Sequence, residues 1–231
     1  MAEAQPLARR LAAEGVGAFF LFAAVIGSGI MAEALSGGNV AVALIGNAAA
    51  TGAILFVLIT MLGPISGAQM NPAVSLVAAS RGALKWSDAA AYIVVQLLCG
   101  IAGALAAHAM FDLPLLQVSD KARTGSGQWL GEAIATFGLV LTIWGTLKHR
   151  PKAVPASVAL YITAAYWFTS STSFANPAIT VARSLTDSFS GIAPGDAPGF
   201  IVAQLAGAAL AALAIRALFD DRVGDEAKPL R

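Results

Sequence analysis

Charged side chains are scarce in this chain, and their scarcity excludes an ordinary soluble domain. Asp, Glu, Lys and Arg make up 12% of the 231 residues, against about 25% in typical soluble domains. Hydrophobic residues make up 58%, and the mean hydropathy is +0.75. The sequence therefore predicts an integral membrane protein.

Cysteine, histidine and net charge are also sparse, and each shortage removes a class of function. The lone Cys99 excludes an intrachain disulfide and a cysteine-based metal site. The chain has two histidines and no His-Glu-x-x-His pattern, so the sequence gives no support for an intramembrane metalloenzyme. A net charge of +1 without a basic stripe gives no support for nucleic-acid binding. We therefore expect no enzyme activity, cofactor, bound metal or nucleic-acid partner.

What the chain does have is long apolar stretches. A helix needs roughly 20 residues to cross about 30 Å of hydrocarbon. Six stretches are long enough, near 11–35, 40–62, 88–111, 128–147, 153–171 and 198–219. The sequence thus predicts an all-α membrane protein with six transmembrane helices.

The Lys and Arg residues predict the orientation of these spans. An even number of spans puts both termini on one side of the membrane. Of the 14 Lys and Arg residues, three fall on the opposite side, namely Lys121, Arg123 and Arg183, which leaves eleven on the side of the termini. Because positive residues concentrate in cytoplasmic segments, we expect both termini to be cytoplasmic.

One tripeptide occurs twice, at Asn71-Pro72-Ala73 and Asn176-Pro177-Ala178. Asn is a favoured helix N-cap and Pro suits the first helical position, so each copy predicts the start of a helix. Non-helical chain is expected before each start, at Gly63–Gly67 and Thr169–Ser173. Both sites follow directly after an apolar span. We therefore expect two short helices that begin inside the bilayer.

The two halves of the chain share further landmarks in one order. Glu14 in the first span corresponds to Glu132 in the fourth, and Gln96 in the third to Gln204 in the sixth. Three spans per half is an odd number, so the second half enters the membrane from the opposite face. The sequence thus predicts inverted repeats at about 8–112 and 126–219, whose short helices meet near the midplane and line a pore.

These motifs together resemble the aquaporins, the major intrinsic protein family of water and small-solute channels. The resemblance covers essentially the whole chain, and the pattern is similar to bacterial aquaglyceroporins that lack the selectivity-filter Arg. It implies one transmembrane channel domain over 1–231, six helices plus two re-entrant half-helices, and a homotetramer with one pore per subunit. It also implies location in a bacterial inner membrane, with water and small neutral solutes as partners.

The resemblance implies a second, outer constriction that sets selectivity. Typical members carry Arg directly after the second Asn-Pro-Ala, where this chain has Ile179. The other family positions correspond to Thr51, Ser173 and Ala164, or to Ile162 in place of Ala164 if the preceding loop is two residues longer. Such a ring is wider than that of a strict water channel. We expect passage of polyols such as glycerol, metalloid hydroxides such as arsenite, and water, with ions and protons excluded by the half-helix dipoles.

Alternative interpretations remain at this stage. A water-selective aquaporin is one, and a proton-coupled secondary transporter using Glu14 and Glu132 is another. We favour a structural role for these acids and for Gln96 and Gln204, since the family's acids accept hydrogen bonds from the re-entrant loops. Arg183 either supplies a cation at the outer vestibule or pairs with Asp187 or lipid headgroups, and we favour the second.

Overall fold

The structure is a computed structural model that describes residues 5–219, and within them the chain is helical and contains no strand. The predicted all-α, aquaporin-like fold is confirmed. The elements are α1 Leu7–Leu35, α2 Val40–Ser66, α3 Pro72–Ser80, α4 Trp86–Met110, α5 Ser126–His149, a 3₁₀ turn η1 Pro151–Ala153, α6 Val154–Phe168, α7 Pro177–Arg183 and α8 Ala197–Leu218.

Five of the described helices are long and apolar enough to cross a membrane: α1, α2, α4, α5 and α8. The stretch expected near 153–171 forms the shorter α6, which has 15 residues and follows directly on η1. At about 1.5 Å per residue, α6 alone is shorter than the hydrocarbon thickness. From Thr169 onward the chain is irregular up to the start of α7 at Pro177.

The segment Gly63–Gly67 is more helical than the sequence predicts. Helix α2 continues through Pro64 to Ser66 and ends at Gly67, which has φ +89°. A proline keeps a helical φ and removes only one N–H donor, so it is tolerated here one turn before the helix ends. Only Gly67–Met70 is irregular before the first Asn-Pro-Ala.

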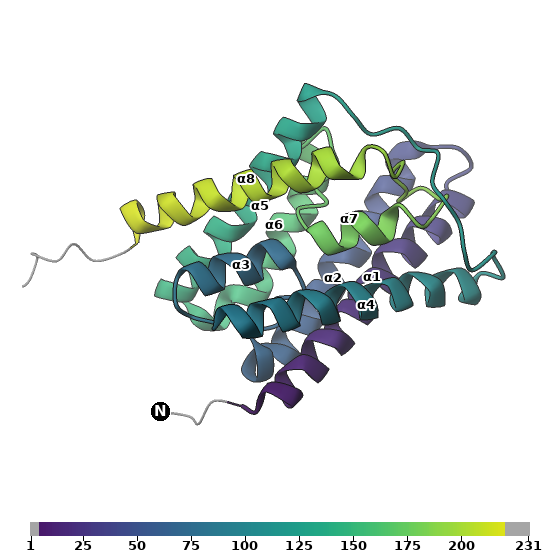
Figure 1. The fold of residues 1–231 in the computed structure, drawn as a ribbon. Coiled ribbons are helices and arrows are strands. Elements are labelled where there is room, and N and C mark those ends of the chain that lie inside the picture. The colour runs from purple at the N-terminus through teal and green to yellow at the C-terminus, as the bar shows by residue number, and fades with distance from the viewer. Residues whose placement is uncertain (1–4, 220–231) are drawn as a thin grey trace, which may run out of the picture.

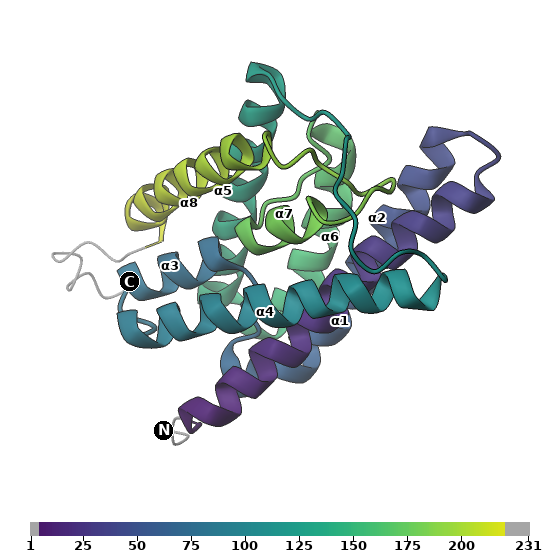
Figure 2. The same ribbon diagram turned by 45° about the vertical axis from the view of Figure 1, so that its right-hand side comes forward.

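The long helices form two groups, and the short helices lie between them (Figures 1 and 2). In one group α1 packs against α2 and α4, and in the other α5 packs against α6 and α8. Contacts between α2 and α6 join the groups. Helix α3 contacts α4, α5 and α8, whereas α7 contacts α1, α4 and α8, and the two short helices contact each other. Each short helix is therefore held by both groups.

Two glycines show how closely the long helices approach. A Cβ atom at Gly103 of α4 would overlap the carbonyl oxygen of Phe19 in α1. A Cβ atom at Gly207 of α8 would overlap the carbonyl oxygen of Ala133 in α5. Small residues permit this backbone contact between membrane helices. A glycine thus permits close packing of α1 with α4 in the first half and of α5 with α8 in the second.

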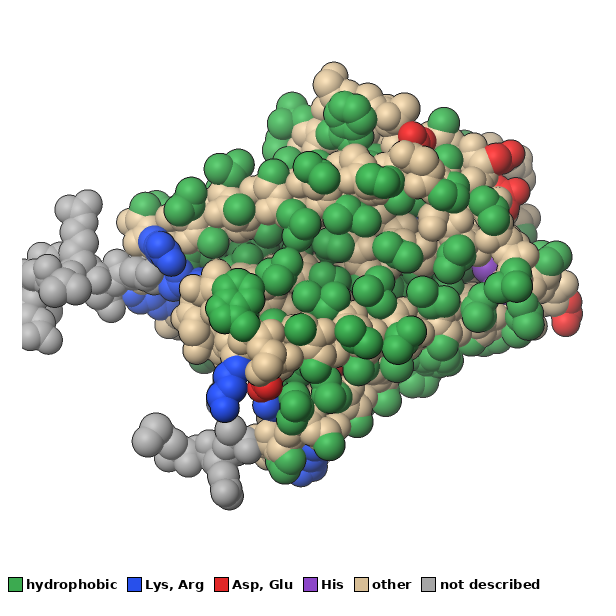
Figure 3. Space-filling view, in the orientation of Figure 1, with side chains coloured by type: hydrophobic (Ala, Val, Ile, Leu, Met, Phe, Trp, Pro, Cys, Tyr) green, Lys and Arg blue, Asp and Glu red, His purple; other side chains and the backbone are tan. Residues whose placement is uncertain are grey.

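The surface matches a membrane-spanning protein. Large apolar side chains are exposed along the helices, among them Phe20, Phe56, Leu98 and Leu213. In Figure 3, hydrophobic side chains cover the middle of the face shown, and Lys and Arg gather at the end where the chain begins. Most of the acidic side chains in that view lie toward the other end. Arg222, Lys228 and Arg231, which belong to the predicted basic side, lie outside the described residues.

Candidate functional site

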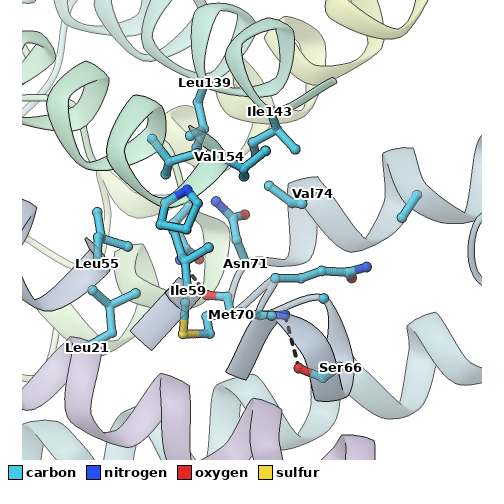
Figure 4. A pocket seen from close by; sticks show the side chains of 18 of the residues that line it. Leu21, Leu55, Ile59, Ser66, Met70, Asn71, Val74, Leu139, Ile143 and Val154 are labelled. Atoms are coloured by element: carbon cyan, nitrogen blue, oxygen red, sulfur yellow. Dashed lines mark hydrogen bonds between the residues drawn. The ribbon is translucent and has the colours of Figure 1, made fainter. Parts of the chain in front are cut away.

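A cavity of about 1060 Å³ runs through the centre of the molecule. Gln5, Lys85 and Lys152 line it at the end of the molecule where the N-terminus lies. Asn71 and Asn176 line its middle, and Arg183 lines its other end. Figure 4 shows Asn71 and Met70 beside a wall of apolar side chains from other helices, namely Leu55, Leu139, Ile143 and Val154. The cavity therefore has one polar side and one apolar side.

Each Asn-Pro-Ala begins a helix in the way the sequence predicts. The Asn71 side chain accepts a hydrogen bond from the Ala73 N–H at 2.9 Å, and Pro72 is the first residue of α3. The Asn176 side chain accepts from the N–H groups of Ala178 and Ile179, at 3.0 and 3.3 Å, at the start of α7. These contacts use the amide oxygens and leave the amide N–H groups for other partners.

The two Asn amides also connect the two loops. Asn71 Nδ2 donates to the carbonyl oxygen of Ala175 at 2.7 Å, and Asn176 Nδ2 donates to the carbonyl oxygen of Met70 at 2.8 Å. Each Nδ2 carries two hydrogens, so one N–H per amide stays free to meet a molecule in the cavity. The two helix starts, far apart in sequence, are thus locked together at the centre of the structure.

The loops before the two Asn residues share an unusual backbone. Ala68 and Met70 have φ of 46° and 47°, and Ser173 and Ala175 have φ of 51° and 47°. Left-handed conformations cost non-glycine residues of order 1–3 kcal/mol each, so the surroundings must hold them. They occur at the same two positions, three residues and one residue before each Asn. The two loops therefore have matching shapes.

Two buried acids hold these loops through their N–H groups. Glu14 accepts from the N–H groups of Gln69 and Met70, at 2.8 and 2.6 Å. Glu132 accepts from those of Phe174 and Ala175, both at 2.8 Å. Both carboxylates have no exposed surface. Because the acids bind the N–H groups, the loops keep their conformation in the interior.

The loop carbonyls, in contrast, lack protein partners. Among the described residues no donor reaches the carbonyl oxygens of Ala68, Gln69, Ser173 or Phe174, and all four residues line the cavity. Buried carbonyl groups need a hydrogen-bond partner. A row of acceptors is therefore available to molecules in the cavity.

Two glutamines complete the acid clusters. Gln96 Nε2 donates to Glu14 at 2.8 Å and to the Ser75 hydroxyl at 3.1 Å. Gln204 Nε2 donates to Glu132 at 2.6 Å and to the Thr180 hydroxyl at 2.9 Å. Ser75 and Thr180 donate in turn to the carbonyl oxygens of Asn71 and Asn176. Each acid is thereby linked to one of the Asn residues.

The outer end of the cavity contains most of the expected filter residues. Thr51, Ser173 and Ile179 line it, and so does Ile162. Ala164 does not line it and is exposed on the outside of α6. Residues two apart on a helix point about 200° away from each other, so Ile162 and Ala164 cannot share a face. Of the two alternatives that the sequence left open, the structure places Ile162 at the cavity.

The sequence analysis missed Tyr166 and Phe174, which also line the cavity at this end. The Tyr166 hydroxyl lies 3.2 Å from the Thr51 hydroxyl, and both residues are buried. Val158, Ile162 and Tyr166 recur every fourth residue along α6 and are all buried. This periodicity was the available signal, since it identifies the inward face of the helix.

The favoured expectation for Arg183 is wrong. Its side chain is 1% exposed and lines the cavity, so it does not meet lipid headgroups. Among the described residues it pairs with no carboxylate, and its Nε donates to the carbonyl oxygen of Ser190. Asp187 lies instead beside a separate hollow with Lys121. The turn from Ser184 to Ser190 folds back over the helix end, which the spacing of charges could not reveal.

Two more cations lie near this end of the cavity. Arg123 donates through Nε to the carbonyl oxygen of Gly191 at 2.7 Å, and its Cζ lies 5.2 Å from the centre of the Phe174 ring. Lys121 donates to the carbonyl oxygen of Phe189 at 2.9 Å. Burial lowers the pKa of both groups, and for Lys121 the neighbouring Arg123 lowers the pKa further. Arg123, Lys121 and Arg183 thus lie close together near the outer end of the cavity.

Comparison with known proteins gives one relative that is similar over nearly its full length and others that are similar over part of it. The family model described as major intrinsic protein matches residues 1–173. The chain is 58% identical over 210 residues to the aquaglyceroporin AqpS of Rhizobium meliloti (strain 1021), covering 91% of this chain and 90% of that protein. It is 31% identical over 141 residues to aquaporin NIP3-1 of Oryza sativa subsp. japonica, covering 59% of this chain but 44% of the plant protein.

The fold is also found among solved structures. The X-ray structure of the aquaglyceroporin from Plasmodium falciparum superposes with a TM-score of 0.72 at 19% identity, covering 92% of this chain and 97% of that one. This likeness establishes the arrangement of helices. With the family model matching most of the chain and a 58% identical relative of similar length, the chain belongs to the major intrinsic protein family.

Proposed function

We propose that this protein is a passive membrane channel for small neutral solutes and water, and not an enzyme. The observation that carries the proposal is the pair of Asn amides facing one central cavity from two helix starts. Membership of a channel family supports it, as does the name aquaglyceroporin of the 58% identical relative. Asn71, Pro72 and Ala73 with Asn176, Pro177 and Ala178 are the proposed centre of the pore.

The two-sided lining fits polyols. Loop carbonyls accept from a solute's hydroxyl groups, and the free N–H groups of Asn71 and Asn176 donate to its oxygens. The CH groups of the same solute face the apolar wall that includes Leu55, Leu139 and Val154. A neutral polyol therefore replaces its hydration shell on one side and buries apolar surface on the other.

The helix starts supply the proposed barrier to cations. The N-terminal end of a helix carries the equivalent of about half a positive charge. Helices α3 and α7 direct two such ends at the same point, where the Asn residues meet. A cation at this point is repelled. A water molecule that accepts hydrogen bonds from both Asn71 and Asn176 has both lone pairs occupied, so it cannot accept a hydrogen bond from its neighbour in the file.

The outer ring of Thr51, Ile162, Ser173 and Ile179 is the proposed selectivity filter. It has Ile179 where typical members carry Arg, so an arginine side chain does not narrow the ring at that position. We infer that the pore admits glycerol and arsenite in addition to water. Glycerol and arsenite entry into vesicles containing the purified protein tests this by stopped-flow light scattering. If these vesicles pass water but exclude both solutes, the water-selective alternative holds.

Proton-coupled transport is disfavoured by the environment of the acids. Each carboxylate of Glu14 and Glu132 accepts at least three hydrogen bonds from loop N–H groups and glutamine amides. Protonation would remove an acceptor that the loops require. Solute flux should therefore rise linearly with concentration and not respond to an imposed pH gradient. Saturating flux that follows the gradient would favour a transporter.

Membrane location, subunit number and internal symmetry complete the proposal. We infer one channel domain over 1–231 with inverted repeats at 8–112 and 126–219, supported by the matching acid and loop contacts of the two halves.

The bacterial relative supports location in an inner membrane. The cluster of Lys and Arg at one end in Figure 3 supports cytoplasmic termini. Native mass spectrometry tests the expected homotetramer, and protease protection of a C-terminal tag in spheroplasts tests the orientation.

A further inference from the structure

The guanidinium group of Arg183 is buried at the outer end of the cavity, and the protein satisfies only part of its five N–H donors. Of its five N–H groups, the Nε group donates to the Ser190 carbonyl oxygen. The Tyr166 hydroxyl is a further side-chain partner of the guanidinium, and among the described residues no other acceptor is found for the Nη groups. The side chain is 1% exposed and lines the cavity, so the cavity is where the remaining donors find partners.

The surroundings hold this cation in place. Its Cζ lies 3.4 Å from the centre of the Phe174 ring, so the guanidinium stacks on the ring face. Arg123 lies near the same ring, at 5.2 Å, but its guanidinium donates to backbone carbonyl oxygens of Gly191, Phe189 and Ser171. Of these two arginines, Arg183 is the one that lines the cavity.

An unpartnered hydroxyl group lies at the same end. The Ser173 hydroxyl is buried and has no hydrogen-bond partner among the described residues. Ser173 lines the cavity together with Arg183, Tyr166 and Thr51. Donors from arginine and hydroxyl groups that both donate and accept thus surround one space. This set suits a molecule that carries several hydroxyl groups.

We propose that Arg183, one helical turn beyond Ile179, supplies the charge and the donors of the outer constriction in place of an arginine at position 179. This inference rests on the proposed channel function and adds a specificity-determining residue to it. The backbone of residue 183 lies about 6 Å further along α7 than that of residue 179, and the Arg183 side chain reaches the cavity at the Phe174 ring. The ring at Ile179 therefore stays wide, while cations still meet a fixed positive charge before they reach the centre of the pore.

The test uses the full-length protein in vesicles, with glycerol flux and Na⁺ or proton leak measured on the same preparation. In Arg183→Gln, the amide can still donate to Ser190 but the charge is gone. We expect cation leak to rise at least about tenfold per unit of glycerol flux, and Arg183→Lys to restore low leak. Arg150→Met, which removes an exposed arginine outside the cavity, is the matched control and should leave both rates unchanged.

The outcomes separate this inference from the channel function. Glycerol flux by the unsubstituted protein tests the channel itself. If that flux is present and leak in Arg183→Gln equals that of the control, Arg183 is not the barrier and the inference fails.

If Arg183→Gln does not reach the membrane, the variant Phe174→Leu provides the test, because it removes the ring on which the guanidinium stacks and keeps the charge. We then expect the glycerol-to-water flux ratio to change at least about threefold with leak near that of the unsubstituted protein, and an unchanged ratio overturns the proposal.

Discussion

Asn71 and Asn176 each donate to the carbonyl oxygen of the residue that precedes the other, at 2.7 and 2.8 Å. Each residue thus caps its own helix and fastens the opposite loop. Because both tasks depend on one planar amide, the distance between the two helix starts and the direction of the free N–H groups are set together. The centre of the pore is therefore a rigid unit and not two independent loops.

Asn71→Ala should cost more stability than the loss of an ordinary cap. The change removes the cap and leaves the Ala175 carbonyl oxygen without its partner, about 2–3 kcal/mol in total. Asn39→Ala is the matched control, because Asn39 caps α2 with N–H groups of Ala41 and Val42 at an exposed site. We expect about 1 kcal/mol there. Unfolding of both variants in detergent measures the difference, and equal losses would mean that the contact between loops contributes nothing.

Glu132→Gln should destabilise the second loop. An amide has one oxygen where the carboxylate has two, and its NH₂ group would face the donors of Ala175 and Gln204. We expect a loss of about 3 kcal/mol and a lower folded yield. Glu33→Gln is the control, since exposed Glu33 accepts one bond from the Phe189 N–H, and it should cost under about 1 kcal/mol. A similar yield and melting temperature for the two variants would refute this account of Glu132.

Gly207→Ala should separate α5 from α8. The added methyl group would overlap the Ala133 carbonyl oxygen, which is backbone and cannot rotate away. We expect a loss of about 1–3 kcal/mol, measured as a lower melting temperature. At Gly127, also within a long helix, a Cβ atom would meet nothing within 4 Å, so Gly127→Ala should be neutral or stabilise the helix by up to about 1 kcal/mol. A stable Gly207→Ala would show that the helices can part without cost.

Ile179→Arg should make the channel more selective for water. The longer side chain enters the space shared with Thr51 and Ser173 and narrows the ring. We expect glycerol and arsenite flux to fall at least about tenfold, a barrier increase of about 1.4 kcal/mol, with a smaller loss of water flux. Ile179→Leu keeps the side-chain volume and should keep all three rates. If the Arg variant still passes glycerol at the original rate, the ring at Ile179 does not limit solute size.

Some features of the site could be predicted from local sequence, and others could not. The caps at Asn71 and Asn176 depend on residues one to three positions away, so the motif is sufficient to predict them. The loop partners of Glu14 and Glu132 were expected from the family resemblance, and buried irregular loops need such acceptors for their N–H groups. The inward position of Tyr166 follows from the four-residue repeat of buried residues in α6, which the family spacing does not contain.

The sequence by itself determined the all-helical membrane fold and the two helix starts, since apolar length and capping residues act over short stretches of chain. Only the tertiary structure decided that Ile162 and not Ala164 faces the cavity, and that Arg183 turns inward onto Phe174. The rotation of a helix about its axis and the direction of a long side chain depend on neighbours distant in sequence, and no local pattern encodes them.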